Sequence, residues 1–87
     1  MCAGLLEQKL IACANILPPH KAMYVWDGMV QNHENECAVI MKSTDEKFSA
    51  IETYVVDHHD YEVPCLVQME ITGGHNPFLE WVKGAVQ

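Results

Sequence analysis

The sequence predicts an α+β fold in which helices cover one face of an antiparallel sheet, and three observations support this prediction. The chain has 87 residues, which suits one domain spanning residues 1–87. Residues 22–26 and 67–72 alternate their side chains with the two-residue period of a strand. Three further segments carry apolar side chains spaced as on one face of a helix: residues 4–12, 43–59 and 76–85.

The three predicted helices have recognisable starts and apolar faces. Ser43 has Glu46 three positions later, the spacing of a capping box. Asn76 is the expected N-cap residue of the third helix, with Pro77 at the first helical position. The second helix is expected to end near residue 58 or 59, because Pro64 disfavours helical backbone before it. The apolar faces consist of Leu6 and Leu10 in the first helix, Phe48, Ile51 and Val55 in the second, and Phe78, Trp81, Val82 and Ala85 in the third.

Strands are expected between these helices. The first begins at residue 22, and its reversal has two candidates. Asp27 and Gly28 form a dipeptide typical of a two-residue hairpin turn, whereas the polar residues 31–36 offer a longer turn further along the chain. Residues 36–42 are an apolar run of strand length, and the last strand follows Pro64 with one wet face.

The composition argues against two classes of partner. Twelve Asp and Glu against five Lys and Arg give a formal net charge of −7, so unassisted binding to nucleic acid is not expected. No apolar run reaches the roughly 18 to 20 residues that cross a bilayer, and the first residues lack the basic start of an export signal. The four cysteines are too widely spaced for a CxxC motif, so we expect reduced, mostly buried thiols and a cytoplasmic protein.

No residue pattern points to catalysis. The two serines lie at a helix start and within a helix, and neither is in a nucleophile elbow. Cys13 and Cys37 lie in apolar, strand-like runs, where burial is a simpler interpretation than thiol catalysis. We therefore expect no enzymatic activity.

The densest group of metal-binding residue types lies at the end of the second helix. His58 and His59 are adjacent there, among Asp57, Asp60 and Glu62, and copper or zinc accepts imidazole together with carboxylate. Adjacent helical side chains diverge by about 100°, so a shared ion requires the helix to unwind at His58 or ligands from elsewhere. The alternative is structural, since a histidine at a helix C-terminus interacts favourably with the dipole. The other histidines lie in turns and are expected to be solvated: His20, His33 and His75.

The chain resembles the CutA divalent-cation-tolerance family in five successive motifs, "KLIACANILP", "YVWDG", "ENECAVIMK", "HHDYEVP" and "GGHNPFLEWV". The resemblance covers nearly the whole sequence. It implies a ferredoxin-like α+β subunit with a C-terminal helix, assembled as a homotrimer, with no settled enzymatic activity. It also implies that the Trp-Asp-Gly segment lies within a long strand, so we place the reversal at residues 31–36.

Departures from the family pattern lead to further expectations. The family opens with a strand before its first helix, and this chain begins inside that helix, so we expect the first strand to be absent. In the family's sheet that strand lies between the third and last strands. Its loss would leave unpaired backbone groups that each cost about 1 to 3 kcal/mol. We expect the remaining strands to shift together or a neighbouring chain to fill the gap.

The family also suggests a role for the paired histidines. Its bacterial members bind copper through a corresponding His-His pair together with a cysteine on the opening strand. The resemblance therefore implies that His58 and His59 are metal ligands, with Cys65 either replacing the missing cysteine or lying in the core. We expect a homotrimeric, non-catalytic divalent-cation tolerance protein that binds copper or another divalent metal. Two alternatives remain, a trimeric regulatory protein that senses a small molecule and an assembly or trafficking factor without a ligand.

Overall fold

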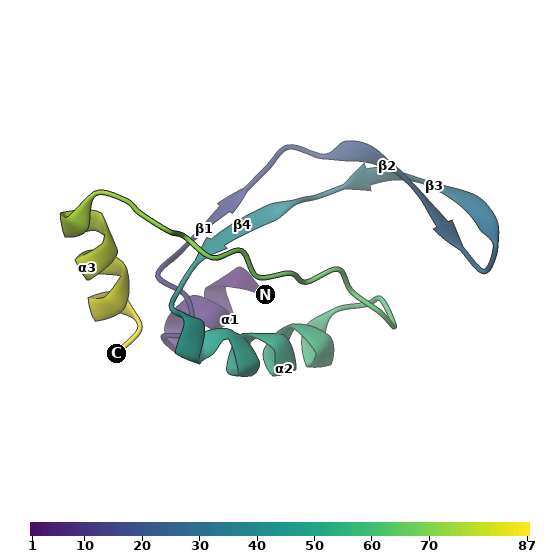
Figure 1. Ribbon diagram of the computed structural model, residues 1–87. Helices are drawn as coiled ribbons and strands as arrows, with labels where there is room; N and C mark the ends of the chain where they lie inside the picture. Colours follow the sequence, from purple (N-terminus) through teal and green to yellow (C-terminus); the bar gives the residue numbers. More distant parts are fainter.

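The computed structural model describes all 87 residues and has the α+β composition that the sequence predicts. In chain order the elements are α1 (Cys2–Glu7), β1 (Cys13–Ile16), β2 (His20–Trp26), β3 (Met29–Glu36), β4 (Val39–Lys42), the 3-10 turn η1 (Asp45–Lys47), α2 (Phe48–His58) and α3 (Asn76–Ala85). Figure 1 shows α1 and α2 on the same side of the strands, and α3 beside the end of the strands at which β4 leads into α2. No helix of the chain is long and apolar enough to cross a membrane.

The four strands form one long antiparallel ribbon. β1 pairs with β4, and β2 pairs with β3. Between the two ladders, the Leu17 N–H donates to the Ala38 carbonyl at 2.9 Å, so hydrogen bonding continues from one pair of strands to the next. The far half of the ribbon, residues 20–36, projects beyond the helices and is called the arm below (Figure 1).

The ribbon reverses at Asp27 and Gly28. Both residues have positive φ, 56° and 74°, the combination that a two-residue type I′ hairpin turn requires. Trp26 and Met29 are therefore paired directly across the turn. The expected reversal at residues 31–36 is wrong, because those residues belong to β3. The Asp-Gly dipeptide accepts the left-handed backbone readily, since Gly has no Cβ and Asp tolerates this region better than most residues.

α1 ends several residues earlier than predicted. Lys9 takes a left-handed φ of 58°, and the Leu10 N–H donates to the Leu5 carbonyl at 3.0 Å, which closes the helix. This turn brings Ile11 into the core beside Leu5, whereas Leu6 is exposed. The predicted helical face of Leu6 and Leu10 is therefore wrong, because the chain has left the helix before Leu10.

α2 begins differently from the prediction but ends where expected. The Ser43 hydroxyl donates to the Leu10 carbonyl at 2.5 Å and caps no helix, so the expected capping box does not form. The helix is instead preceded by η1, whose N-cap residue is Thr44, and the N-cap residue of α2 itself is Lys47. Its last residue is His58, as predicted, and its apolar face is confirmed by the burial of Ile51 and Val55.

α3 begins one residue earlier than predicted and has a different buried face. Pro77 lies in its first turn, with His75 as the N-cap residue. Val82 is buried in the helix, and Val86 is buried just beyond it. Phe78 and Trp81 were expected to be buried, yet they are 41% and 51% exposed. This single chain provides no surface that covers them.

The core is small and lies between the helices and the base of the ribbon. Only six of the 87 residues are buried: Leu5, Ile11, Ile51, Val55, Val82 and Val86. The first four form one cluster that joins α1, α2 and the segment leading into β1. Gly4 lets the helices approach, because any side chain at this position would collide with the Tyr54 hydroxyl. Such a core is at the lower limit for an independent domain.

Residues 66–72 are not a strand in this structure, so that prediction is wrong. The segment makes no backbone hydrogen bond to any other part of the chain. It is held by Leu66, which packs on the core, and by Gln68, which donates to Asp45 Oδ1 at 2.6 Å. Its alternating apolar residues are exposed: Val67, Met69 and Ile71. The strands of this chain therefore do not shift together to provide it with a partner, so the first of the two alternatives is wrong. The other alternative, that a neighbouring chain fills the gap, stays a prediction.

Candidate functional site

His58 lies at the last position of α2, where its ring is fixed by the preceding turn of the helix. The ring stacks on Tyr54 at a centroid distance of 4.0 Å and an angle of 10°. Its Nδ1 lies 2.8 Å from the Tyr54 carbonyl oxygen. Because a carbonyl only accepts, Nδ1 carries the proton and the neutral ring has its lone pair on Nε2. The side chain is exposed, so this lone pair is accessible to a ligand.

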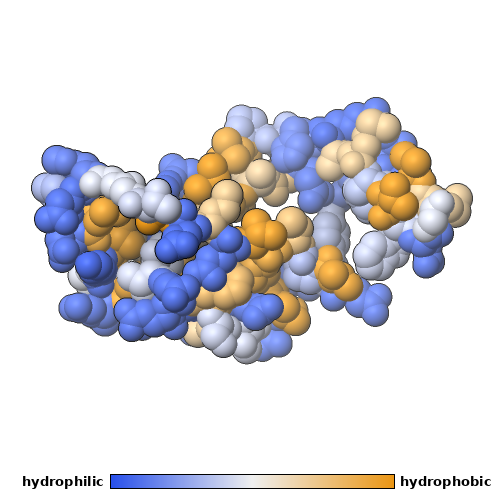
Figure 2. Space-filling model, in the orientation of Figure 1, coloured by the Kyte–Doolittle hydropathy of each residue, from blue (hydrophilic) through white to orange (hydrophobic).

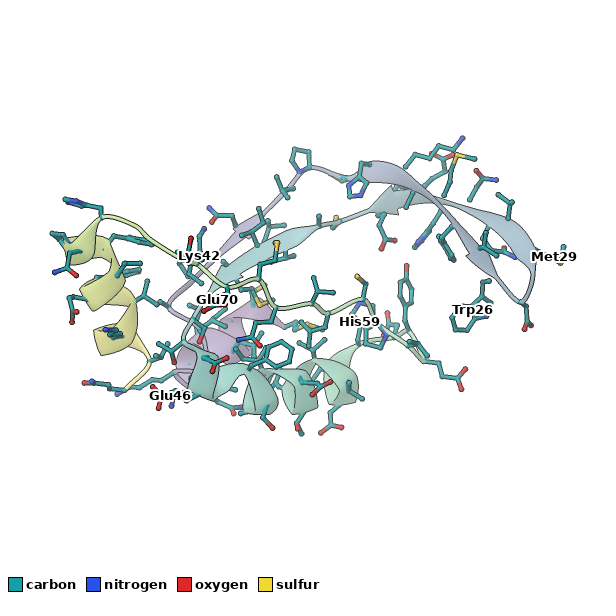
Figure 3. All side chains as sticks on the ribbon, in the orientation of Figure 1. Trp26, Met29, Lys42, Glu46, His59 and Glu70 are labelled. Atoms are coloured by element: carbon teal, nitrogen blue, oxygen red, sulfur yellow. The ribbon has the colours of Figure 1, made fainter.

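His59 is outside the helix, and its ring has a different neighbour. Its backbone is extended, with φ −90° and ψ 145°. Its Nδ1 accepts a hydrogen bond from the Tyr61 N–H at 3.0 Å, so the proton of the neutral ring is on Nε2. The ring lies edge-on to Tyr61 at 4.6 Å. Figure 3 shows His59 beyond the end of α2, on the side that faces the arm.

The helix continues through His58 and ends before His59, so it has not unwound at His58, as a shared ion would require without ligands from elsewhere. The two rings also rest on different tyrosines, Tyr54 and Tyr61, and no group of three or more His, Cys, Asp or Glu side chains is placed to hold a metal ion. Cys65 is exposed, so it is not the core thiol that was the alternative expectation. The donor types fit a borderline cation such as copper or zinc, but the two imidazoles have separate neighbours and no third ligand is placed beside them.

A second polar cluster, which the sequence did not predict, joins the arm to the loop after α2. His33 Nδ1 and the Tyr61 hydroxyl are 2.6 Å apart, and the hydroxyl donates to Glu36 Oε2 at 3.0 Å. His33 Nδ1 is also 2.5 Å from Glu36 Oε2. His33 was expected in a solvated turn, but it lies within β3 and is partly buried. The residues around Tyr61 in the sequence do not indicate this contact, because its partners are 25 and 28 residues away.

A bulge in β3 places His33 and Glu36 on the same side of the strand. Ala22 pairs with His33, and His20 pairs with Glu36, so the arm has one extra residue on β3. Asn35, next to Glu36, has a left-handed backbone with a φ of 60°, which accommodates the extra residue. Side chains three residues apart on a regular strand point to opposite faces, and the extra residue corrects this.

The cluster changes the acidity of the tyrosine. Partial removal from solvent, followed by the hydrogen bond to Glu36 and the negative charge of Glu36, raises the pKa of the Tyr61 phenol above its usual value of 10.0. Each cause disfavours a phenolate beside a carboxylate. At neutral pH Tyr61 therefore stays protonated and donates its hydrogen bond.

A hollow of about 400 Å³ lies on the other side of α2, against the segment that follows α1. Tyr54, Asp57 and His58 line it from the helix, and Gln8 and Leu10 line it from the facing segment. One polar, one acidic and one imidazole group thus meet an apolar wall. Hollows of this volume are within the range that binds small molecules.

These features define a small ferredoxin-like α+β protein with two adjacent histidines at the end of a helix, and comparison with known proteins identifies its family. The chain belongs to the family described as "CutA1 divalent ion tolerance protein", whose sequence model matches residues 1–85. It is similar to the Arabidopsis thaliana protein named "Protein CutA, chloroplastic", with 34% identity over 97% of this chain and 46% of that protein. The chain spans about half the length of the curated relatives it matches first, 46%, 49% and 54%.

Solved structures are similar over the whole chain. The divalent cation tolerance protein CutA1 from Thermus thermophilus superposes with a TM-score of 0.94 at 30% identity, covering 99% of this chain and 82% of that one. A structure described as "PII-like protein CutA from Nostoc sp. PCC 7120 in apo form" superposes with a TM-score of 0.89 at 25% identity, covering 99% and 83%. The family's name refers to tolerance of divalent ions and to no reaction.

Proposed function

We propose that this chain is a divalent-cation tolerance protein that binds copper or another divalent cation and catalyses no reaction. The observation that carries the proposal is the pair of imidazoles at the point where α2 ends. His58 is exposed and has its Nδ1 beside the Tyr54 carbonyl, which leaves Nε2 for a ligand, and His59 lies just outside the helix. The family's description as a divalent ion tolerance protein supports the same class of ligand.

The chemistry of the chain suits this role. Neutral imidazole nitrogen is a good ligand for copper and zinc. A net charge of −7 raises the concentration of cations near the surface, which favours their capture. His58 can bind through Nε2 without losing its hydrogen bond to the Tyr54 carbonyl. For His59 to use Nδ1, the hydrogen bond from the Tyr61 N–H must be given up.

Calorimetric titration with cupric or zinc ion tests this proposal. His58→Ala and His59→Ala are expected to lower the affinity about tenfold or more, since even the loss of an outer-shell partner costs 10- to 100-fold. His75→Ala is the matched control, because His75 lies at the start of α3 and belongs to neither cluster. Equal affinity in the parent and all three variants would exclude the paired histidines as ligands.

We also propose that the chain assembles as a homotrimer. Its support is the amount of apolar surface that the single chain leaves exposed, both on residues 66–72 and on the arm. Figure 2 shows apolar residues at the surface of the arm and over the middle of the molecule, and Figure 3 shows Trp26 and Met29 at the tip of the arm, away from the helices. Large exposed apolar patches on soluble proteins commonly mark interaction surfaces. A neighbouring chain would also supply partners for the unpaired backbone of residues 66–72.

The mass in solution tests the assembly. Sedimentation equilibrium is expected to give the mass of three chains of 9.8 kDa. Met69→Glu, on the exposed row of residues 66–72, is expected to weaken the assembly, whereas Glu52→Gln on the exposed face of α2 is expected to leave it unchanged. A single-chain mass across the accessible concentration range would contradict the trimer.

We also propose that the protein is located in the cytoplasm. The support is four cysteines without a disulfide, two of them exposed, which is typical of a reducing compartment. Fractionation of cells that express the tagged chain checks this, and recovery from an organelle or from outside the cell would contradict it.

A regulatory role is the second candidate, and the hollow beside α2 favours it. Tyr54, Asp57 and His58 could orient a small polar ligand against Leu10. The fold is shared with the protein described as PII-like. Thermal unfolding with a panel of nucleotides in the presence of a chelator tests this role, because a ligand that binds the folded state raises the midpoint. Binding of neither metal nor metabolite would instead favour an assembly or trafficking factor without a ligand.

A further inference from the structure

β4 and the chain that follows α2 run in the same direction without forming a ladder. The Tyr61 hydroxyl donates to Glu36 Oε2 at 3.0 Å, and Gln68 Nε2 donates to Asp45 Oδ1 at 2.6 Å. The two pairs are 25 and 23 residues apart in sequence, and a separation that stays nearly constant indicates parallel segments. Figure 1 shows both segments running toward α3. Side chains therefore hold the two segments at both ends, although no backbone hydrogen bond joins them.

The edge of β4 that lies toward this segment is unpaired. β4 pairs with β1 alone, and the carbonyls of Ala38 and Lys42 accept hydrogen bonds from the residues that flank β1. Backbone groups of a strand point alternately to its two edges, so those of Val39 and Met41 point away from β1. Figure 1 shows residues 61–68 on that side of β4. The N–H and C=O groups of Val39 and Met41 therefore have no backbone partner.

The space between β4 and residues 61–72, called the slot below, has an apolar floor. Met41 of β4 and Leu66 of the facing segment both pack on the core cluster. The side chains that alternate with Leu66 are 63% to 80% exposed, whereas a cross-strand neighbour would cover part of each: Val67, Met69 and Ile71. Unpaired backbone on both sides and an apolar floor are the features that the addition of a strand requires.

We propose that the slot binds one extended peptide segment of another polypeptide, which adds a strand between β4 and residues 61–72. Because the two edges run in the same direction, one strand is antiparallel to both, which is the more stable pairing. The occupant has apolar side chains toward the core cluster and β-branched side chains on its other face, beside Val67 and Met69. The net charge of −7 disfavours an acidic segment. This inference depends neither on the paired histidines nor on the homotrimer.

A strand from a second copy of this chain does not meet the requirements of the slot. The occupant needs both of its edges free, because it meets unpaired backbone on each side. Each strand from β1 to β4 already has one edge paired with another strand. Residues 66–72 are free on both edges, but Leu66 and Gln68 anchor them to their own chain. A neighbouring copy can still pair with the outer edge of residues 66–72, which leaves the slot to a different polypeptide.

Amide hydrogen exchange measured by nuclear magnetic resonance tests the slot with a synthetic peptide, Lys-Val-Thr-Val-Thr-Val-Lys with blocked ends. The peptide is expected to slow exchange at Val39, Met41 and alternate amides of residues 65–72 by about tenfold or more. The matched control peptide carries N-methyl groups on its three valines, which remove the donors of one edge, and is expected to give no protection. No slowing at the highest soluble peptide concentration would overturn the proposal. Amides that are already protected without the peptide would overturn it too, because another copy would then fill the slot.

A pair of variants at the free edge of β4 tests the role of the backbone. Val39→Pro removes an N–H group that points into the slot, at the first residue of a strand, where proline is tolerated. Its affinity for the peptide is expected to fall about tenfold, since one hydrogen bond is lost and its acceptor is left unpaired. Val39→Thr keeps the N–H group and nearly the same shape, so it is expected to bind as the parent does. Far-ultraviolet circular dichroism checks that both variants fold, and equal affinities of the two folded variants would contradict strand addition at this edge.

Discussion

The two ends of the ribbon are built from the same antiparallel ladder, yet they are stabilised differently. At the base, β1 and β4 lie against α1 and α2, and Ile11 at the entry to β1 is 1% exposed. In the arm, no residue of β2 or β3 is buried, and Val25 and Met29 are 69% and 64% exposed. The base therefore gains its stability from apolar burial, whereas the arm of the single chain depends on its turn, its ladder and the contact with Tyr61.

This difference shows which part of the chain is stabilised by its own core and which part exposes apolar side chains that a partner could cover. A two-stranded hairpin without a covering layer is marginal in water. The arm and residues 66–72 together contain many of the exposed large apolar side chains. These side chains are not covered by any part of these 87 residues, although Leu66 at the start of the second segment packs on the core.

The largest difference in stability between the base and the arm is expected when a substitution creates a cavity at the base. Leu5→Ala removes a side chain that is 0% exposed and is expected to lower the free energy of unfolding by about 2 to 5 kcal/mol. Met29→Ala at the tip of the arm is the comparison variant and is expected to change it by less than about 0.5 kcal/mol when both variants are single chains. Urea unfolding of the two variants, at a concentration where they have the same mass, measures both. Equal effects would mean that base and arm are equally buried in solution.

A substitution in the turn of the arm is expected to have the next largest effect on stability. Gly28→Ala places a Cβ at a φ of 74° and is expected to destabilise the hairpin by about 1 to 2 kcal/mol, although no atom lies within 4 Å of that Cβ. Gly73→Ala is the matched control, since its surroundings are equally open and its φ is not positive. There the loss of chain entropy in the unfolded state is expected to be neutral or slightly stabilising. Urea unfolding compares the two, and equal midpoints would argue against the type I′ turn.

A smaller effect is expected where the arm meets the loop after α2. Tyr61→Phe removes the hydroxyl that contacts His33 and Glu36 but keeps the ring. Amide hydrogen exchange in β3 is expected to increase a few-fold in the metal-free protein, because the arm loses its side-chain link to that loop. Tyr24→Phe, whose hydroxyl makes no hydrogen bond, is the control. Unchanged exchange in β3 would show that the ladder alone holds the arm.

The smallest effect is expected at high pH. The pKa of Tyr61 is raised in the folded state. At a pH between the pKa of about 10 in the unfolded chain and the higher pKa in the folded chain, Tyr61 is protonated more often in the folded chain than in the unfolded one. Its contribution to stability is therefore fully present below about pH 10 and decreases as the pH rises through this interval. Spectrophotometric titration is expected to show one tyrosine that ionises late, and Glu36→Gln is expected to lower its pKa. A Tyr61 whose pKa is not raised above the usual value of 10.0 would contradict the cluster in solution.

Local sequence patterns correctly predicted features that depend on residues close together in the chain. The apolar face and the end of α2 follow from side-chain spacing and from Pro64, and both were predicted correctly. Asp27 and Gly28 likewise have the chemistry of the turn that forms, although the family pattern favoured a later reversal. Two histidines at a helix end were visible as candidate ligands, since they are adjacent in the chain. Their role as ligands is still a prediction.

Tertiary structure decided the features that depend on a distant partner. Residues 66–72 alternate like a strand, but a strand also needs a neighbour for its backbone, and this chain supplies none. Phe78 and Trp81 have helical spacing, but whether a helical face is buried depends on what lies against it. Tyr61 meets His33 and Glu36 only because a bulge in β3 and a loop after α2 bring residues far apart in sequence together. Local conformations thus follow from neighbouring residues, whereas the packing of distant segments determines which of them are paired, buried or chemically linked.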